Sequence, residues 1–187
     1  MSLENITFEG KHIDEKILHF TKPSKIQTIY ENIRILIPVL LIQTLSIFLY
    51  NYGILNIIYF IIFWIILDFA TFLTIYYKIY RVNKNFLIIT SKRILFHGME
   101  GLFKDYVKKI SYDNVRNVNY FTTSILGKIY NYGTLEIQSS HGGLGDITVY
   151  NINNGKMLTH YIDKIMHLTP DERTNFGEFD PNYFKKD

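Results

Sequence analysis

The sequence predicts a two-helix transmembrane hairpin followed by a small β-rich domain that one amphipathic helix closes. Three observations support this fold class. Between Ile35 and Tyr77 the only charged residue is Asp68, and all 20 lysines and arginines lie outside that stretch. After Asn85, short runs of β-branched and aromatic residues alternate with turn residues, as in consecutive strands. After Asn153, apolar residues recur at helical spacing.

The hairpin is predicted from two apolar segments, residues 35–52 and 54–77. At 1.5 Å per residue the shorter one reaches about 27 Å, close to the roughly 30 Å of a hydrocarbon core. Asn51, Tyr52 and Gly53 leave room only for a turn, so the helices should be antiparallel neighbours. The alternative is a pair of buried helices in a soluble core, but such helices normally have a polar face and these segments have almost none.

The first helix is expected to begin before the bilayer. Pro23, Ser24 and Gln27 form a helix-start pattern, so the helix would enter the membrane near Arg34. Pro38 then kinks the helix or marks the start of its inserted part.

Basic residues at the ends of the apolar segments predict the orientation. Positively charged residues close to a span favour the cytoplasmic side, so both termini are expected in the cytoplasm and the chain in the cell membrane. Residues 78–93 hold five bases and no acid. These five are the predicted contacts with anionic lipid headgroups, and they are Lys78, Arg81, Lys84, Lys92 and Arg93.

Asp68 is a candidate site because a charged carboxylate inside a span costs on the order of 3 kcal/mol. It should be paired, buried or protonated, and Gln43 on the first helix is a possible partner. The two interpretations are an ion or proton site and a polar contact between helices. One acid without a matching base favours association over transport.

The soluble part is predicted to contain six strands and two helical segments. A turn of helix is expected between Ser124 and Tyr130, and a final helix that Asn153 or Asn154 caps should end before Pro170. The predicted strands are residues 85–90, 93–97, 102–110, 115–121, 134–140 and 147–152.

Specific residue combinations then indicate a family. Ile89-Thr90 is followed by Arg93-Ile94-Leu95, Ile125-Leu126-Gly127 leads to Tyr132-Gly133-Thr134-Leu135-Glu136-Ile137, and Gly142-Gly143 comes after. Asp14 to Leu18 and Lys22-Pro23-Ser24 form a lead-in. Most of the chain thus resembles bacterial pleckstrin-homology (PH) domains of the membrane-flanked type. The resemblance implies a PH-like β-barrel with a C-terminal helix, a bacterial source and no established enzyme activity.

Two features depart from the family pattern. Ser111 stands where the family commonly has proline, and a complete PH barrel has seven strands where six are predicted. The expected organisation is a cytoplasmic N-terminal segment (1–33), the hairpin (34–77), a PH-like domain (78–168) and a disordered polar tail (169–187).

No catalytic, cofactor or metal site is predicted. The chain has no cysteine, and its six histidines lack the spacing of a zinc hydrolase. Residues 142–146 are glycine-rich but lie between two strands, and Thr90 with Arg93 is interpreted as fixing a turn rather than as an active pair. A lipid-modifying enzyme would need a cleft lined by Arg93, His97 and Asp105. The aromatics fall at core positions, so nucleic-acid binding is not expected either.

The predicted function is therefore that of a membrane-anchored, non-enzymatic module at the cytoplasmic membrane surface. Its expected partners are the membrane, anionic lipid headgroups, and a protein partner or a second copy of the chain. The alternative is a subunit of an oligomeric transport or channel assembly that uses Asp68.

Overall fold

The computed structural model describes residues 14–53, 56–101, 104–122 and 124–180. These residues form two compact units. The first is a helical hairpin spanning residues 25–82, and the second is a β-rich module made from the described residues before Lys25 and after Val82.

The hairpin consists of α1 (Lys25–Asn51) and α2 (Ile57–Lys84). Both helices are long and apolar enough to cross a membrane, and almost none of their side chains is buried. They are therefore not the buried core of this chain. The predicted apolar segments lie inside these helices except at the turn, where Tyr52 and Asn56 lie outside both helices and Ile54 and Leu55 fall outside the described residues. The helix α1 continues through Pro38 and does not begin there.

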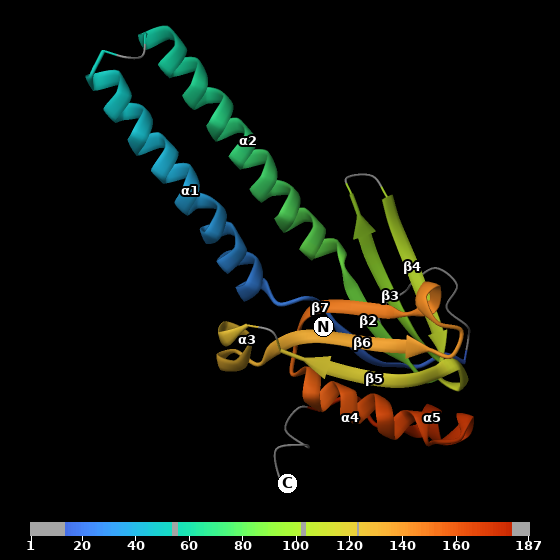
Figure 1. The fold of residues 1–187 in the computed structure, drawn as a ribbon. Coiled ribbons are helices and arrows are strands. Elements are labelled where there is room, and N and C mark those ends of the chain that lie inside the picture. The colour runs from blue at the N-terminus through green and yellow to red at the C-terminus, as the bar shows by residue number, and fades with distance from the viewer. Residues whose placement is uncertain (1–13, 54–55, 102–103, 123, 181–187) are drawn as a thin grey trace. The chain divides into compact units, whose positions relative to one another are not determined.

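The module contains seven strands in two antiparallel sheets (Figure 1). The first sheet has the order β1-β2-β3-β4, formed by β1 (Ile17–Thr21), β2 (Phe86–Thr90), β3 (Arg93–Glu100) and β4 (Lys104–Ser111). The second has the order β5-β6-β7, formed by β5 (Val115–Phe121), β6 (Tyr132–Ser139) and β7 (Ile147–Asn153). Two short 3-10 helices, η2 (Tyr112–Asn114) and η3 (Gly143–Gly145), connect β4 to β5 and β6 to β7.

The prediction of a closed barrel is wrong, because the described strands form two separate sheets. The chain leaves the first sheet at η2, where Tyr112 is buried, and enters the second sheet at β5. The core lies between the sheets, so the inward-facing residues of both carry it, for example Ile94, Leu135 and Ile137.

The seventh strand comes from the segment before the hairpin. The strand β1 pairs with β2, and Thr21 lies opposite Leu87. The expected separation of a 1–33 segment from the PH-like domain therefore does not match the structure. The hairpin is an insertion between two neighbouring strands of one sheet.

The helix α4 (Gly155–Met166) closes the core, as the spacing of its apolar residues predicts. It lies against β5 and β6 (Figure 1). Its buried face carries Leu158, Tyr161, Ile162 and Ile165. The short helix α3 (Ile125–Ile129) joins β5 to β6, and the Ser124 hydroxyl caps it by accepting from the backbone N–H of Gly127 at 2.9 Å.

The segment after α4 is ordered as far as the structure describes it, which differs from the predicted disorder of residues 169–187. The helix α5 (Pro170–Asn175) begins with a capping box between Thr169 and Glu172. Phe176 and Phe179 then pack against the core, so aromatic burial orders this segment despite its polar composition. Residues 181–187 lie outside the described residues.

Candidate functional site

The two predicted intramembrane polar residues contact each other. The Gln43 side chain on α1 donates from Nε2 to Oδ1 of Asp68 on α2, at 2.8 Å. The Asp68 side chain stays exposed on the hairpin surface. One hydrogen bond thus links the helices while leaving carboxylate surface open to a further contact.

A second polar link lies close to the first and was not predicted. Trp64 on α2 donates from its indole N–H to the hydroxyl of Ser46 on α1, at 2.8 Å, and this hydroxyl also contacts the carbonyl oxygen of Gln43 at 2.8 Å. Ser46 is buried. The spacing in the sequence could have predicted this contact, because Ser46 lies one turn after Gln43 and Trp64 lies one turn before Asp68.

The predicted basic residues separate into two groups. Lys78, Arg81 and Lys84 lie on the last two turns of α2, and Arg81 and Lys84 are exposed. Lys78 forms an ion pair with Glu31 of α1 at 3.4 Å. Lys92 and Arg93 follow β2 in the module. The five bases thus belong to the end of α2 and to the β2–β3 turn.

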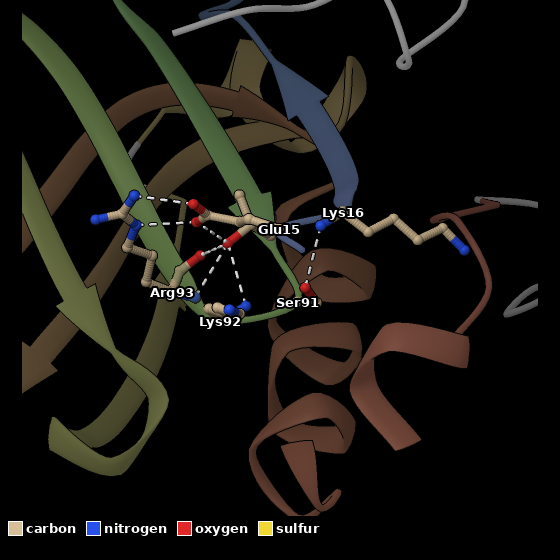
Figure 2. A network of polar contacts seen from close by, with 6 residues as sticks. Glu15, Lys16, Ser91, Lys92 and Arg93 are labelled. Atoms are coloured by element: carbon tan, nitrogen blue, oxygen red, sulfur yellow. Dashed lines mark hydrogen bonds and ion pairs between the residues drawn. The ribbon is translucent and has the colours of Figure 1, made fainter. Parts of the chain in front are cut away.

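Arg93 is held by an internal carboxylate. Its Nε and Nη2 atoms each lie 2.9 Å from a different oxygen of Glu15, whose side chain is completely buried (Figure 2). A buried two-point pair of this kind fixes the guanidinium in place. Lys92 is the exposed base at this turn. The headgroup contact of both residues stays a prediction.

Thr90 completes the network. Its role is therefore structural, in line with the interpretation that Thr90 and Arg93 fix a turn. Its hydroxyl donates to Oε1 of Glu15 at 2.8 Å and accepts the backbone N–H of Arg93 at 3.0 Å. The backbone of Lys16 is also bound to Ser91 in both directions. The network ties the segment before β1 to the β2–β3 turn, and Glu15 is the member that the sequence did not reveal.

The module has a cavity of about 430 Å³ between α3 and the start of α4. It lies where β7 ends and β6 begins, since Asn154 donates a backbone hydrogen bond to Asn131 at 2.9 Å. Both asparagines have left-handed backbones, with φ of 54° and 53° for Asn131 and Asn154. The polar lining consists of Tyr120, Thr122, Lys128, Asn131, Asn154 and Lys156.

The electrostatics of this cavity favour an acidic ligand. The first turn of α4 contains no acid, and the Asn154 side chain makes no capping hydrogen bond. The positive end of the helix dipole therefore adds to the charges of Lys128 and Lys156. Neither lysine pairs with an acid in the part of the chain that the structure describes. The ring of Tyr120 packs directly on Gly155, where a side chain would clash with it.

The residues named for a lipid-modifying enzyme do not converge. His97 lies 3.4 Å from Asp105, and its Nδ1 contacts the carbonyl oxygen of Lys84 at 3.1 Å. Arg93 lies four residues away along β3 and is bound to Glu15. Among the described residues, no group of three or more histidine or acidic side chains is arranged to hold a metal ion.

Comparison with family models shows the family of this chain. The family model described as the bacterial PH domain matches residues 33–166, well over half of the chain. It confirms the resemblance indicated by the Ile89–Leu95 and Tyr132–Ile137 motifs. The match begins inside α1, so it includes most of the hairpin and excludes β1. No curated protein and no solved structure matches the chain.

Proposed function

Because this chain belongs to the bacterial PH domain family, we propose that it is a non-enzymatic binding module that its helical hairpin anchors in the bacterial cell membrane. PH domains in general bind proteins or lipids. In this proposal the module faces the cytoplasm and binds acidic groups, carried by a protein partner or by lipid headgroups.

The insertion of the hairpin between β1 and β2 is the observation that carries the proposal. These strands are antiparallel neighbours, and Thr21 at the end of β1 lies opposite Leu87 near the start of β2. Both ends of the hairpin therefore connect to one place on the module. A hairpin that crosses a bilayer would hold the module at one membrane face, and the flanking bases favour the cytoplasmic face.

The cavity between α3 and α4 is the proposed ligand site of the module. Lys128 and Lys156 contribute two positive charges, and the backbone N–H groups at the start of α4 are available as donors. This donor set suits a carboxylate or a phosphate group.

Photocrosslinking in native membranes tests the proposed function. A photoreactive residue in place of Met157, which lines the cavity without contributing a charge, reports on the site, and one at exposed Lys104 on β4 serves as the control. A specific protein or lipid adduct at position 157 only, lost on Lys128→Glu, is the expected result. Equal adducts at both positions would contradict a defined site.

The cysteine-free sequence allows a direct test of the anchor. Single cysteines at Gly53, in the hairpin turn, and at Lys156 are exposed to a membrane-impermeant maleimide in intact cells. Labelling at position 53 only is expected. Labelling of neither or of both before lysis would argue against a hairpin with a cytoplasmic module.

The exposed Asp68 supports a second candidate, in which several copies assemble through their hairpins into a transport or channel complex. Within a bilayer an exposed carboxylate is costly unless another polar group covers it. Asp68→Leu should then reduce the oligomer size in detergent, and Thr74→Leu on the same helix is the control. An unchanged oligomer and an unchanged cellular phenotype in Asp68→Leu would eliminate this candidate.

A further inference from the structure

An open groove of about 580 Å³ lies on the hairpin, between the module-side part of α1 and Lys78 of α2. One end of the groove is polar and the other is apolar. The polar end contains Tyr30, Arg34 and Lys78, and the apolar wall contains Ile35, Val39 and Ile42. A site that changes from cationic to apolar along its length suits an amphiphile, which has a charged head and an apolar tail.

The charges of the polar end are not balanced within the hairpin. Glu31 accepts from Gln27 Nε2 at 3.0 Å on one oxygen and from Lys78 Nζ at 3.4 Å on the other. Its single negative charge is thus matched by Lys78. Arg34 lies one turn further along α1, is exposed, and has no hydrogen bond or ion pair to any residue between 14 and 180 that the structure describes.

The position of Arg34 in the sequence sets the depth of the groove. It is the last charged residue before the uncharged stretch that begins at Ile35. In a membrane-spanning hairpin its guanidinium would therefore lie at headgroup level. Ile42 is eight residues further along α1, about 12 Å deeper. The apolar wall would thus face the upper part of an acyl chain.

We propose that this groove binds one anionic phospholipid, with its phosphate on Arg34 and Lys78 and one acyl chain along the apolar wall. A guanidinium can bind a phosphate through two parallel hydrogen bonds, and Lys78 lies where it can reach the same group. Basic pockets between membrane helices on the cytoplasmic side favour such headgroups. This inference rests on the proposed function, because it requires the hairpin to cross the bilayer.

Native mass spectrometry of the full chain, released from nanodiscs that contain equal amounts of phosphatidylglycerol and phosphatidylcholine, tests the proposal. The wild-type protein should retain one phosphatidylglycerol in preference to phosphatidylcholine. Arg34→Gln should reduce that retention about tenfold, because it removes a charged two-point contact. The control is Lys25→Gln, which removes one positive charge from the exposed start of α1 outside the groove.

A second variant separates a bound lipid from a phosphate ion held by charge alone. Val39→Trp leaves Arg34 and Lys78 in place but fills the apolar wall, so it should also reduce retention of phosphatidylglycerol. Equal losses in Arg34→Gln and Lys25→Gln, or no loss in either groove variant, would overturn the groove as a lipid site.

Alkaline extraction of the wild-type membranes distinguishes this inference from the proposed function. If the wild-type chain is extracted as a peripheral protein, the anchor and the lipid site both fail. If it stays in the membrane while Arg34→Gln retains phosphatidylglycerol as the wild type does, only the lipid site fails.

Discussion

Glu15 shows how much one residue contributes to this module. Its side chain is completely buried and receives Arg93 at two points and the hydroxyl of Thr90. Removing one member of a buried ion pair leaves the other charge without compensation. Glu15→Gln should therefore lower the free energy of unfolding of the module by about 3 kcal/mol, measured by thermal unfolding of the detergent-solubilised chain.

An exposed ion pair provides the control for Glu15. Lys104 and Glu100 lie 3.0 Å apart with about two thirds or more of each side chain exposed, at 73% and 65%. Lys104→Gln should change stability by less than about 0.5 kcal/mol, because solvent screens such pairs. Similar losses in the two variants would show that the Glu15 network does not hold the module together.

His19 on β1 predicts a pH dependence. Burial lowers the pKa of His19 to about 4, from 6.5 in an unfolded chain. As the pH falls through this window the unfolded state binds a proton that the native state does not, so stability decreases toward acid. The loss at pH 4 should be roughly 3 kcal/mol, which a series of unfolding curves between pH 7 and pH 4 would measure.

Comparison with a variant isolates the histidine from other acid effects. His19→Phe keeps a ring beside Phe179, whose centroid lies 4.6 Å from that of His19. The stability difference between wild type and His19→Phe should grow as the pH falls to 4. Curves that stay parallel across this range would refute the assignment to His19.

At the scale of elements, the C-terminal segment stabilises the module by capping α4 and covering β1. The buried Arg173 donates to the carbonyl oxygens of Ile165 and Met166 at 3.0 and 3.3 Å, which satisfies the last turn of α4. The backbone N–H of Phe179 donates to the carbonyl oxygen of Leu18 in β1, and the Tyr161 hydroxyl donates to Gly177.

Truncating the ring of Phe179 tests this role. Phe179 packs edge-on against Tyr161 with ring centroids 5.2 Å apart, and it is half-buried. Phe179→Ala should cost about 2 kcal/mol of stability, less than a fully buried phenylalanine. Phe121→Ala, at a 44% exposed position on β5, should cost much less. The comparison uses chemical unfolding of both variants, and equal costs would mean that the segment does not pack as described.

At the scale of the whole molecule, the module is one folding unit that the hairpin interrupts. The network of Glu15, the pairing of β1 with β2 and the contact of Phe179 with Leu18 all connect the residues before the hairpin to those after it. The module therefore needs both parts of the chain.

Replacing the hairpin tests this topology. A chain that joins Ser24 directly to Asn83 through about four glycine and asparagine residues should fold as a soluble domain, because the strand ends it connects are neighbours. A chain that begins at Asn83 should not fold, because it lacks β1. Circular dichroism and cooperative unfolding distinguish the two proteins. A stable fold from residues 83–187 alone would contradict the assignment of β1 to the core.

The features that depend on local pattern could be predicted from the sequence alone. An uncharged stretch of apolar residues specifies two long helices, alternation specifies β2 to β7, and helical spacing specifies α4. Gln43 and Asp68 could be paired because each is a rare polar residue in an apolar helix. The family motifs Ile89–Leu95 and Tyr132–Ile137 lie in these local elements, so they too were visible.

The features that depend on contacts between residues far apart in the sequence became visible only in the folded chain. The strand β1 is short and lies more than sixty residues from its partner β2, so its pattern alone could not place it. Glu15 gave no signal because an acid is normally exposed, and only the partners Thr90 and Arg93 make its burial favourable. The structure of the segment after α4 could not be predicted for the same reason. Its few aromatic rings are stabilised only when they pack on the core surface that the rest of the chain forms.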